Sequence, residues 1–139
     1  MKDLLVNLPY GSSEYIQVDV PDKNLAGVLE PPEVRSASDE TALVRKALDN
    51  PIGTPVLKKM VKPGMKVAIV ISDASRPNVE AKIVPQVVAD LASVGIPPED
   101  LIFGVGTGAH RQATQEELVD MLGEELVQRA TIINHQADI

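Results

Sequence analysis

The chain has 139 residues, of which 44% are hydrophobic and 2% aromatic, and its formal net charge is -7. This length predicts one domain with a core of Val, Ile, Leu and Ala. The acidic balance argues against a nucleic-acid or anionic-membrane surface, and the scarcity of aromatic side chains argues against single-stranded nucleic-acid binding. The absence of cysteine excludes disulfides and thiolate metal sites, and no apolar run approaches the roughly 20 residues of a membrane span, so a cytoplasmic location is expected.

The first predicted element is an antiparallel hairpin. Residues 3–8 and 15–20 are short, apolar-rich strands, and the turn-rich segment 9–13 joins them. Residues 21–35 contain three prolines and show no hydrophobic period, so they predict an extended connector.

Beyond the connector, the sequence predicts helices that alternate with buried strands. Short runs of branched aliphatic residues alternate with segments whose apolar residues recur at helical spacing. The sequence TQEE at 114–117 also matches a capping box at the start of a helix. The predicted strands are 66–72, 101–105 and 131–134, and the predicted helices lie between 40 and 50, near 55–61, between 78 and 95, at 115–122 and at 124–129.

These elements predict an α/β fold: a Rossmann-like, open, mainly parallel sheet with helices on both faces and an N-terminal hairpin. The connections between the strands are short, which favours right-handed crossovers and parallel pairing. Residues 1–139 are expected to be a single α/β domain. Because the chain stops where a further helix is expected, we interpret it as the N-terminal fragment of a longer two-domain protein.

Two polar segments follow the first two predicted strands of the sheet. They are residues 71–77 (ISDASRP) and 104–111 (GVGTGAHR). In an open parallel sheet, ligands bind beyond the carboxyl ends of the strands, so an acid, two arginines and a histidine are expected at one edge. In one interpretation, the Asp73 carboxylate holds the guanidinium of Arg76 in place, and Arg76 binds the carboxylate of a substrate. The alternative is an Asx-type turn with Arg76 in solvent.

The second segment predicts a glycine-rich loop that carries His110. A histidine there suits a general base, and the alternative is a hydrogen-bonding residue of the loop. Amides near Thr107 and Gly108 suit a bound phosphate or carboxylate. The glycines loosely match a dinucleotide fingerprint, but no acid ends the third strand, which argues against an NAD dehydrogenase. His135 follows that strand, and both a functional and a structural role remain open for it.

Several of these motifs occur together in a fixed order. From about Lys66 to the end, the chain resembles the N-terminal domain of the nickel-dependent lactate racemase family. One departure is Ala74-Ser75, where the family more often has a larger residue and threonine. The motifs that carry the resemblance are residues 72–77, residues 107–111 with Thr114 and Glu116-Glu117 behind them, residues 122–126, and Asn134-His135.

The resemblance implies a racemase or epimerase of 2-hydroxy acids, in which a nickel pincer nucleotide accepts a hydride from the substrate and returns it. It implies that His110 is one of the two catalytic histidines that remove and return the hydroxyl proton. It further implies that Arg76 binds the substrate carboxylate and that Asp73 belongs to the same substrate-binding loop and orients it. The residues implied to lie beside the cofactor are Thr107, Gly108 and Ala109.

The resemblance also places part of the active site outside this chain. In the family, a second catalytic histidine, the lysine that tethers the cofactor and the nickel-binding histidine lie beyond the position of Ile139. No metal ligand is therefore assigned here, and the isolated chain is expected to be inactive. The expected partners are a small 2-hydroxy acid and a C-terminal domain of the same protein. The alternative function is a non-catalytic small-anion or nucleotide-binding α/β module.

Overall fold

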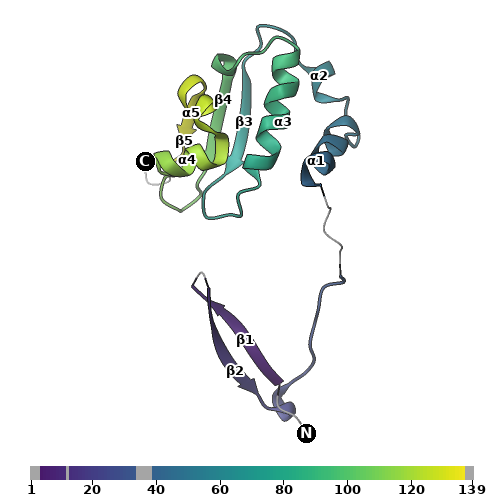
Figure 1. The fold of residues 1–139 in the computed structure, drawn as a ribbon, viewed down its shortest axis with the longest axis vertical. Helices are drawn as coiled ribbons and strands as arrows, with labels where there is room; N and C mark the ends of the chain where they lie inside the picture. The colour runs from purple at the N-terminus through teal and green to yellow at the C-terminus, as the bar shows by residue number, and fades with distance from the viewer. Residues whose placement is uncertain (1–3, 12, 34–38, 137–139) are drawn as a thin grey trace. The chain divides into compact units, whose positions relative to one another are not determined.

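Two compact units, residues 1–36 and 37–139, make up the computed structural model, which describes residues 4–11, 13–33 and 39–136 (Figure 1). That residues 1–139 are one domain of a longer protein stays a prediction.

The first unit is the predicted hairpin. Strands β1 (Leu4–Tyr10) and β2 (Glu14–Val20) pair antiparallel over their whole length. A short 3₁₀ turn at Asp22–Asn24 follows. The rest of the described connector, to residue 33, forms no regular element, and residues 34–38 lie outside the described residues.

The second unit contains a parallel sheet of three strands, as the sequence predicted. Its strands are β3 (Val67–Ser72), β4 (Leu101–Gly106) and β5 (Thr131–Asn134), in the order β3-β4-β5. They form where branched aliphatic residues fit the pleated surface of a sheet. The register pairs Ser72 with Gly106, so β3 and β4 end at the same level.

Helices connect these strands and precede them. Helix α3 (Glu80–Ser93) connects β3 to β4, while α4 (Gln115–Leu122) and α5 (Glu124–Arg129) connect β4 to β5. The predicted capping box opens α4, since Thr114 accepts from the Glu117 amide and Glu117 accepts from the Thr114 amide. The remaining elements are α1 (Glu40–Asp49), α2 (Leu57–Met60) and a 3₁₀ turn at Pro98–Asp100.

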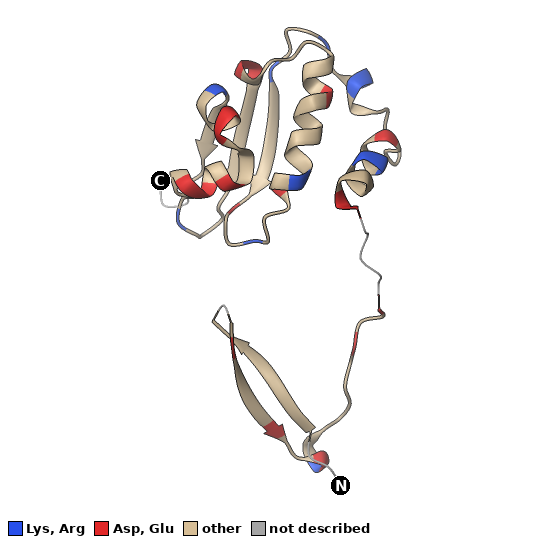
Figure 2. Ribbon diagram, in the orientation of Figure 1, with Lys and Arg blue, Asp and Glu red and all other residues tan. Residues whose placement is uncertain are grey.

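Within the second unit, a charged contact attaches helix α1 to helix α3. Both terminal guanidinium nitrogens of Arg45 bind the carboxylate of Asp90, at 2.9 and 2.7 Å, although Asp90 is only 6% exposed. Lys58 of α2 lies 3.4 Å from the same carboxylate. Figure 2 shows these basic residues on α1 and α2, while acidic residues predominate on α4 and α5. The Asp90 carboxylate thus fixes the two N-terminal helices of this unit.

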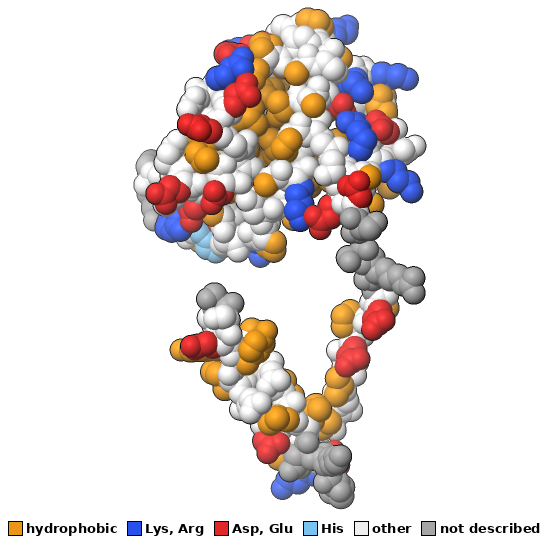
Figure 3. Space-filling view, in the orientation of Figure 1, with side chains coloured by type: hydrophobic (Ala, Val, Ile, Leu, Met, Phe, Trp, Pro, Cys, Tyr) orange, Lys and Arg blue, Asp and Glu red, His pale blue; other side chains and the backbone are white. Residues whose placement is uncertain are grey.

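The core lies on one face of the sheet. Alternate strand residues, such as Ile71, Phe103 and Val105, contact the apolar faces of α3, α4 and α5. On the outer side of these helices, hydrophobic side chains line a groove of about 580 Å³ between α3 and the α4–α5 pair (Figure 3). No helix among the described residues is long and apolar enough to cross a membrane.

The expectation of helices on both faces is wrong for the described residues. The strand order β3-β4-β5 never reverses, and right-handed crossovers that advance in one direction place their helices on the same face. A doubly wound sheet needs a reversal of strand order, and none occurs within the described strands, so a Rossmann-like fold is not confirmed. On the opposite face, Val70 is 80% exposed and Ile133 is 56% exposed.

The two faces are expected to respond differently to the same substitution. Val70→Thr should change the free energy of unfolding by no more than about 0.5 kcal/mol, because this side chain already contacts solvent. Val105→Thr, on the buried face, should cost about 1–3 kcal/mol, because a hydroxyl is buried without a partner. Urea unfolding followed by circular dichroism measures both changes. An equal loss at the two positions would show that the face of Val70 is covered.

Candidate functional site

The chain places Asp73 and His110 at the same edge of the sheet. Asp73 follows β3 directly, and His110 lies on the loop that follows β4. This loop turns back on itself because the His110 amide donates to the Thr107 carbonyl at 2.9 Å. Gly108 makes the turn possible, since its φ of 57° lies in the left-handed region that favours glycine.

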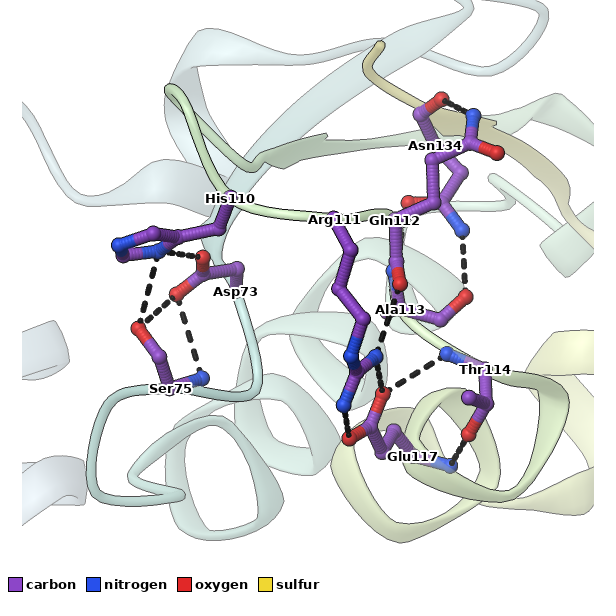
Figure 4. Close-up of polar contacts among 9 residues, drawn as sticks. All are labelled: Asp73, Ser75, His110, Arg111, Gln112, Ala113, Thr114, Glu117 and Asn134. Atoms are coloured by element: carbon purple, nitrogen blue, oxygen red, sulfur yellow. Dashed lines mark hydrogen bonds and ion pairs between the residues drawn. The ribbon is translucent and has the colours of Figure 1, made fainter.

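Asp73 and His110 form a direct hydrogen-bonded pair (Figure 4). The Nδ1 atom of His110 lies 2.5 Å from Oδ2 of Asp73. Hydrogen bonds from Ser75 and then from His110 lower the pKa of Asp73, so the carboxylate is ionised at neutral pH and can only accept. Nδ1 must therefore carry the proton, and the other ring nitrogen, Nε2, is the one that accepts.

The same carboxylate also closes the turn after β3. Its Oδ1 accepts from the hydroxyl of Ser75 at 2.7 Å and from the Ser75 amide at 3.3 Å. The Asp73 carbonyl accepts from the Arg76 amide at 3.2 Å. The Asx-type turn that the sequence offered as an alternative is thus present, and Asp73 holds His110 at the same time.

The two arginines at this edge differ in their partners. Arg111 makes two hydrogen bonds to the carboxylate of Glu117, at 2.8 and 2.7 Å, and one to the Gln112 carbonyl. Among the described residues, the Arg76 side chain has no hydrogen-bond or ion-pair partner. Arg76 is therefore the guanidinium that a ligand can use, while Arg111 stabilises the start of α4.

Asn134, at the end of β5, anchors the far end of the His110 loop. Its side chain accepts from the Ala113 amide at 3.2 Å and donates to the Ala113 carbonyl at 2.7 Å. Gln112 adds a bond to the Asn134 carbonyl at 2.7 Å. The sequence reasoning missed the roles of Asn134 and Ser75. The role of Ser75 has a local sequence signal, because a hydroxyl two residues after an aspartate can bond to its carboxylate. The role of Asn134 has none, because its partner Ala113 lies 21 residues away.

The hydroxyl of Thr107 is used within the protein. Thr107 is 1% exposed, and its hydroxyl donates to the His135 carbonyl at 2.9 Å while it lies 3.0 Å from Nδ1 of His135. A hydroxyl has one proton, so Nδ1 of His135 must donate to it. The Thr107 hydroxyl is therefore not available to a ligand, and the Thr107 amide and carbonyl are bonded to Val105 and His110. His135 has a structural contact here, and a further role remains open.

The predicted site residues all line one hollow of about 160 Å³ at the carboxyl edge of the sheet. The space beside Gly108 is open, because a Cβ added at this position would have no atom within 4 Å. The structure thus brings the predicted residues together, and their individual roles stay predictions. The hollow is lined by Ser72, Asp73, Arg76, Gly106, Thr107, Gly108, Ala109 and His110.

The described residues do not provide a metal site. No group of three or more His, Asp and Glu side chains converges within residues 4–11, 13–33 and 39–136. The described histidines, His110 and His135, each use Nδ1 for a contact inside the protein. This donor set does not fit a nickel ion held by the described residues.

The fold and this edge define an α/β domain that gathers a histidine, an acid and an arginine without a side-chain partner among the described residues around one small hollow. The model of the lactate racemase N-terminal domain matches residues 10–139, so the chain belongs to this family. The resemblance inferred from the sequence motifs is confirmed.

Two curated lactate racemases are also similar in sequence to this chain. The lactate racemase of Lactiplantibacillus plantarum is 34% identical over 132 residues, which is 94% of this chain and 31% of the relative. That of Thermoanaerobacterium thermosaccharolyticum is 28% identical over 134 residues, covering 95% of this chain and 31% of the relative. The chain therefore spans less than a third of the length of these curated relatives.

A solved structure supports the fold. The lactate racemase apoprotein from Thermoanaerobacterium thermosaccharolyticum superposes with a TM-score of 0.71 at 28% identity, covering 96% of this chain and 30% of that one. The combination of a parallel three-stranded sheet with an antiparallel hairpin thus matches a lactate racemase structure.

The bond between Arg111 and Glu117 predicts a dependence of stability on pH. Arg111, followed by the Thr114 amide, lowers the pKa of Glu117 from 4.5 to about 2. Because the folded-state pKa is depressed, this carboxylate stabilises the fold above pH 4.5, and its contribution is lost as the pH falls from 4.5 to about 2. Glu117→Gln should lower the free energy of unfolding at pH 7 and flatten its decline in that window.

Glu116→Gln is the matched control, since Glu116 is exposed and has no side-chain partner among the described residues. Urea unfolding at a series of pH values measures both variants. Equal pH slopes for Glu117→Gln and the unchanged protein would contradict the assignment.

Proposed function

We propose that this chain is the N-terminal part of a longer lactate-racemase-like isomerase that acts on a small 2-hydroxy acid. One observation carries the proposal: the Asp73–His110 pair and the unpartnered Arg76 line the same hollow. A histidine and a guanidinium are the groups needed to remove a hydroxyl proton beside a carboxylate. The length of the relatives supports a further, C-terminal domain. A cytoplasmic location stays a prediction.

His110 is the general base in this proposal. Asp73 holds Nδ1 protonated, so Nε2 can accept the proton of the substrate hydroxyl and later return it. The negative carboxylate also stabilises the imidazolium that forms when the proton is transferred. Asp73, assigned to the substrate-binding loop from the sequence, acts here by orienting His110.

Arg76 binds the substrate carboxylate. A planar guanidinium matches a carboxylate with two parallel hydrogen bonds, which orients the substrate as well as binding it. Arg76 and His110 line the same hollow, which supports the proposal that a carboxylate bound by Arg76 would bring the adjacent hydroxyl close to His110.

The nickel pincer nucleotide implied by the family would supply, when bound, a centre that accepts and returns a hydride. The donor set of the described residues does not fit nickel, so its ligands must come from outside them. The backbone at Thr107, Gly108 and Ala109 suits a lining role beside such a group, because the Gly108 and Ala109 amides have no hydrogen-bond acceptor among the described residues. The isolated chain is expected to be inactive for the same reason.

Substitution of His110 tests the proposed base in the longer protein. His110→Ala should lower kcat by about 10²- to 10⁴-fold, the usual contribution of a positioned general base. His135→Ala is the control, and it should chiefly lower the melting temperature because His135 contacts Thr107. Racemisation from each enantiomer measures the rates. Near-unchanged racemisation by His110→Ala would remove this histidine from the mechanism and favour the anion-binding module.

Arg76 is tested by its effect on substrate binding. Arg76→Ala should lower kcat/KM by roughly 10- to 150-fold, because a hydrogen bond to a charged group contributes about 1.5–3 kcal/mol. Arg76→Lys should restore only part of it, since an ammonium lacks the planar fork. Arg111→Lys, at the arginine that Glu117 already binds, should lower stability with little change in KM. A normal kcat/KM for Arg76→Ala would contradict the assignment.

A further inference from the structure

The carboxylate of Asp73 is held on both of its oxygens. Oδ2 accepts from Nδ1 of His110, and Oδ1 accepts from the hydroxyl and the amide of Ser75. The Ser75 hydroxyl also lies 3.2 Å from Nδ1 of His110 (Figure 4). Because the hydroxyl proton points to Oδ1, Ser75 fixes the rotation of the carboxyl group about its bond to Cβ.

The orientation of His110 depends on this carboxylate more than on packing. The His110 side chain is 56% exposed, whereas that of Asp73 is 7% exposed. Among the described residues, the other hydrogen-bonding neighbour of the imidazole is the Ser75 hydroxyl itself. A carboxylate that rotates freely would therefore leave the ring free to turn or to change its tautomer.

We infer that Ser75 is a positioning residue: its hydroxyl locks the Asp73 carboxylate, so that His110 keeps the proton on Nδ1 and presents Nε2 to the hollow. The effect of Ser75 on catalysis rests on the proposed function, whereas its effect on the tautomer of His110 does not. The two are therefore tested separately.

Nitrogen NMR of the 139-residue chain tests the tautomer directly. The chain has only two histidines, so two-bond correlations between ring protons and nitrogens give the tautomer of each ring, and the signals lost in His135→Ala identify His135. At alkaline pH, His110 of the unchanged chain should show Nδ1 protonated and Nε2 unprotonated. Ser75→Val should raise the fraction of His110 that carries its proton on Nε2. Ser75→Thr introduces a side chain of the same shape as Val but keeps a hydroxyl, so His110 should stay protonated on Nδ1.

Two internal checks separate this result from damage to the fold. Ser75 is exposed, so neither substitution disturbs the core. The His135 ring, which Thr107 holds, should keep its Nδ1–H pattern in every variant. Ser93→Ala removes a hydroxyl that donates to the Asp90 carbonyl, far from the site in sequence, and should leave His110 unchanged. An unaltered His110 tautomer in Ser75→Val would overturn the inference.

Activity of the longer protein gives the second readout. Ser75→Val should lower kcat about tenfold, as expected for one hydrogen bond worth about 1 kcal/mol, and Ser75→Thr should recover most of it. If His110→Ala keeps its racemisation rate, the proposed function fails while the tautomer result stands. If Ser75→Val changes neither tautomer nor kcat while His110→Ala is inactive, only the role of Ser75 fails.

Discussion

The parallel pairing of β3 with β4 is the constraint on which the rest of this structure depends. Its register places Ser72 opposite Gly106, so the chain leaves both strands at the same edge. Phe103 and Val105, both fully buried, hold this register because a slip by one residue would move them to the exposed face. The pairing is what allows Asp73 and a histidine 37 residues away to share a hydrogen bond.

The position of His110 is set by neighbouring elements rather than by its own loop. A glycine in the left-handed region turns the loop, but Asn134 of β5 and the Arg111–Glu117 pair of α4 fix where it ends. Most polar side chains at the edge are thereby committed to protein contacts. Within the described part of this edge, the groups left for a ligand are Nε2 of His110, the Arg76 guanidinium and the amides of Gly108 and Ala109. The proposed proton transfer on a small anion rests on this pairing of a histidine held by a carboxylate with a nearby guanidinium.

The one-sided sheet follows from the direction of its crossovers. Parallel sheets usually carry helices on both faces, because their strands are apolar on both sides. Here the strand order advances steadily, so α3, α4 and α5 gather on one face and Val70 remains in solvent on the other. The relatives are about three times longer than this chain, so the fold described here is a portion of what a lactate racemase contains.

The sequence by itself determined the helices and strands of the second unit, and it predicted which residues gather at the carboxyl edge of the sheet. Local signals suffice for these: branched aliphatic runs mark the strands, TQEE marks the start of α4, and polar residues after two strands mark the edge. The family motif at residues 72–77 and 107–111 is equally local.

The tertiary structure alone decided which groups these residues contact. The Asp73–His110 bond, the commitment of Arg111 to Glu117 and the anchoring by Asn134 join residues between 6 and 37 positions apart, whose distances no local pattern encodes. The covered face of the sheet was likewise undetermined, because alternating apolar residues such as Val70 and Ile71 look alike until the strand order is known. Local preference fixes backbone conformation, whereas pairing order and handedness fix which side chains meet.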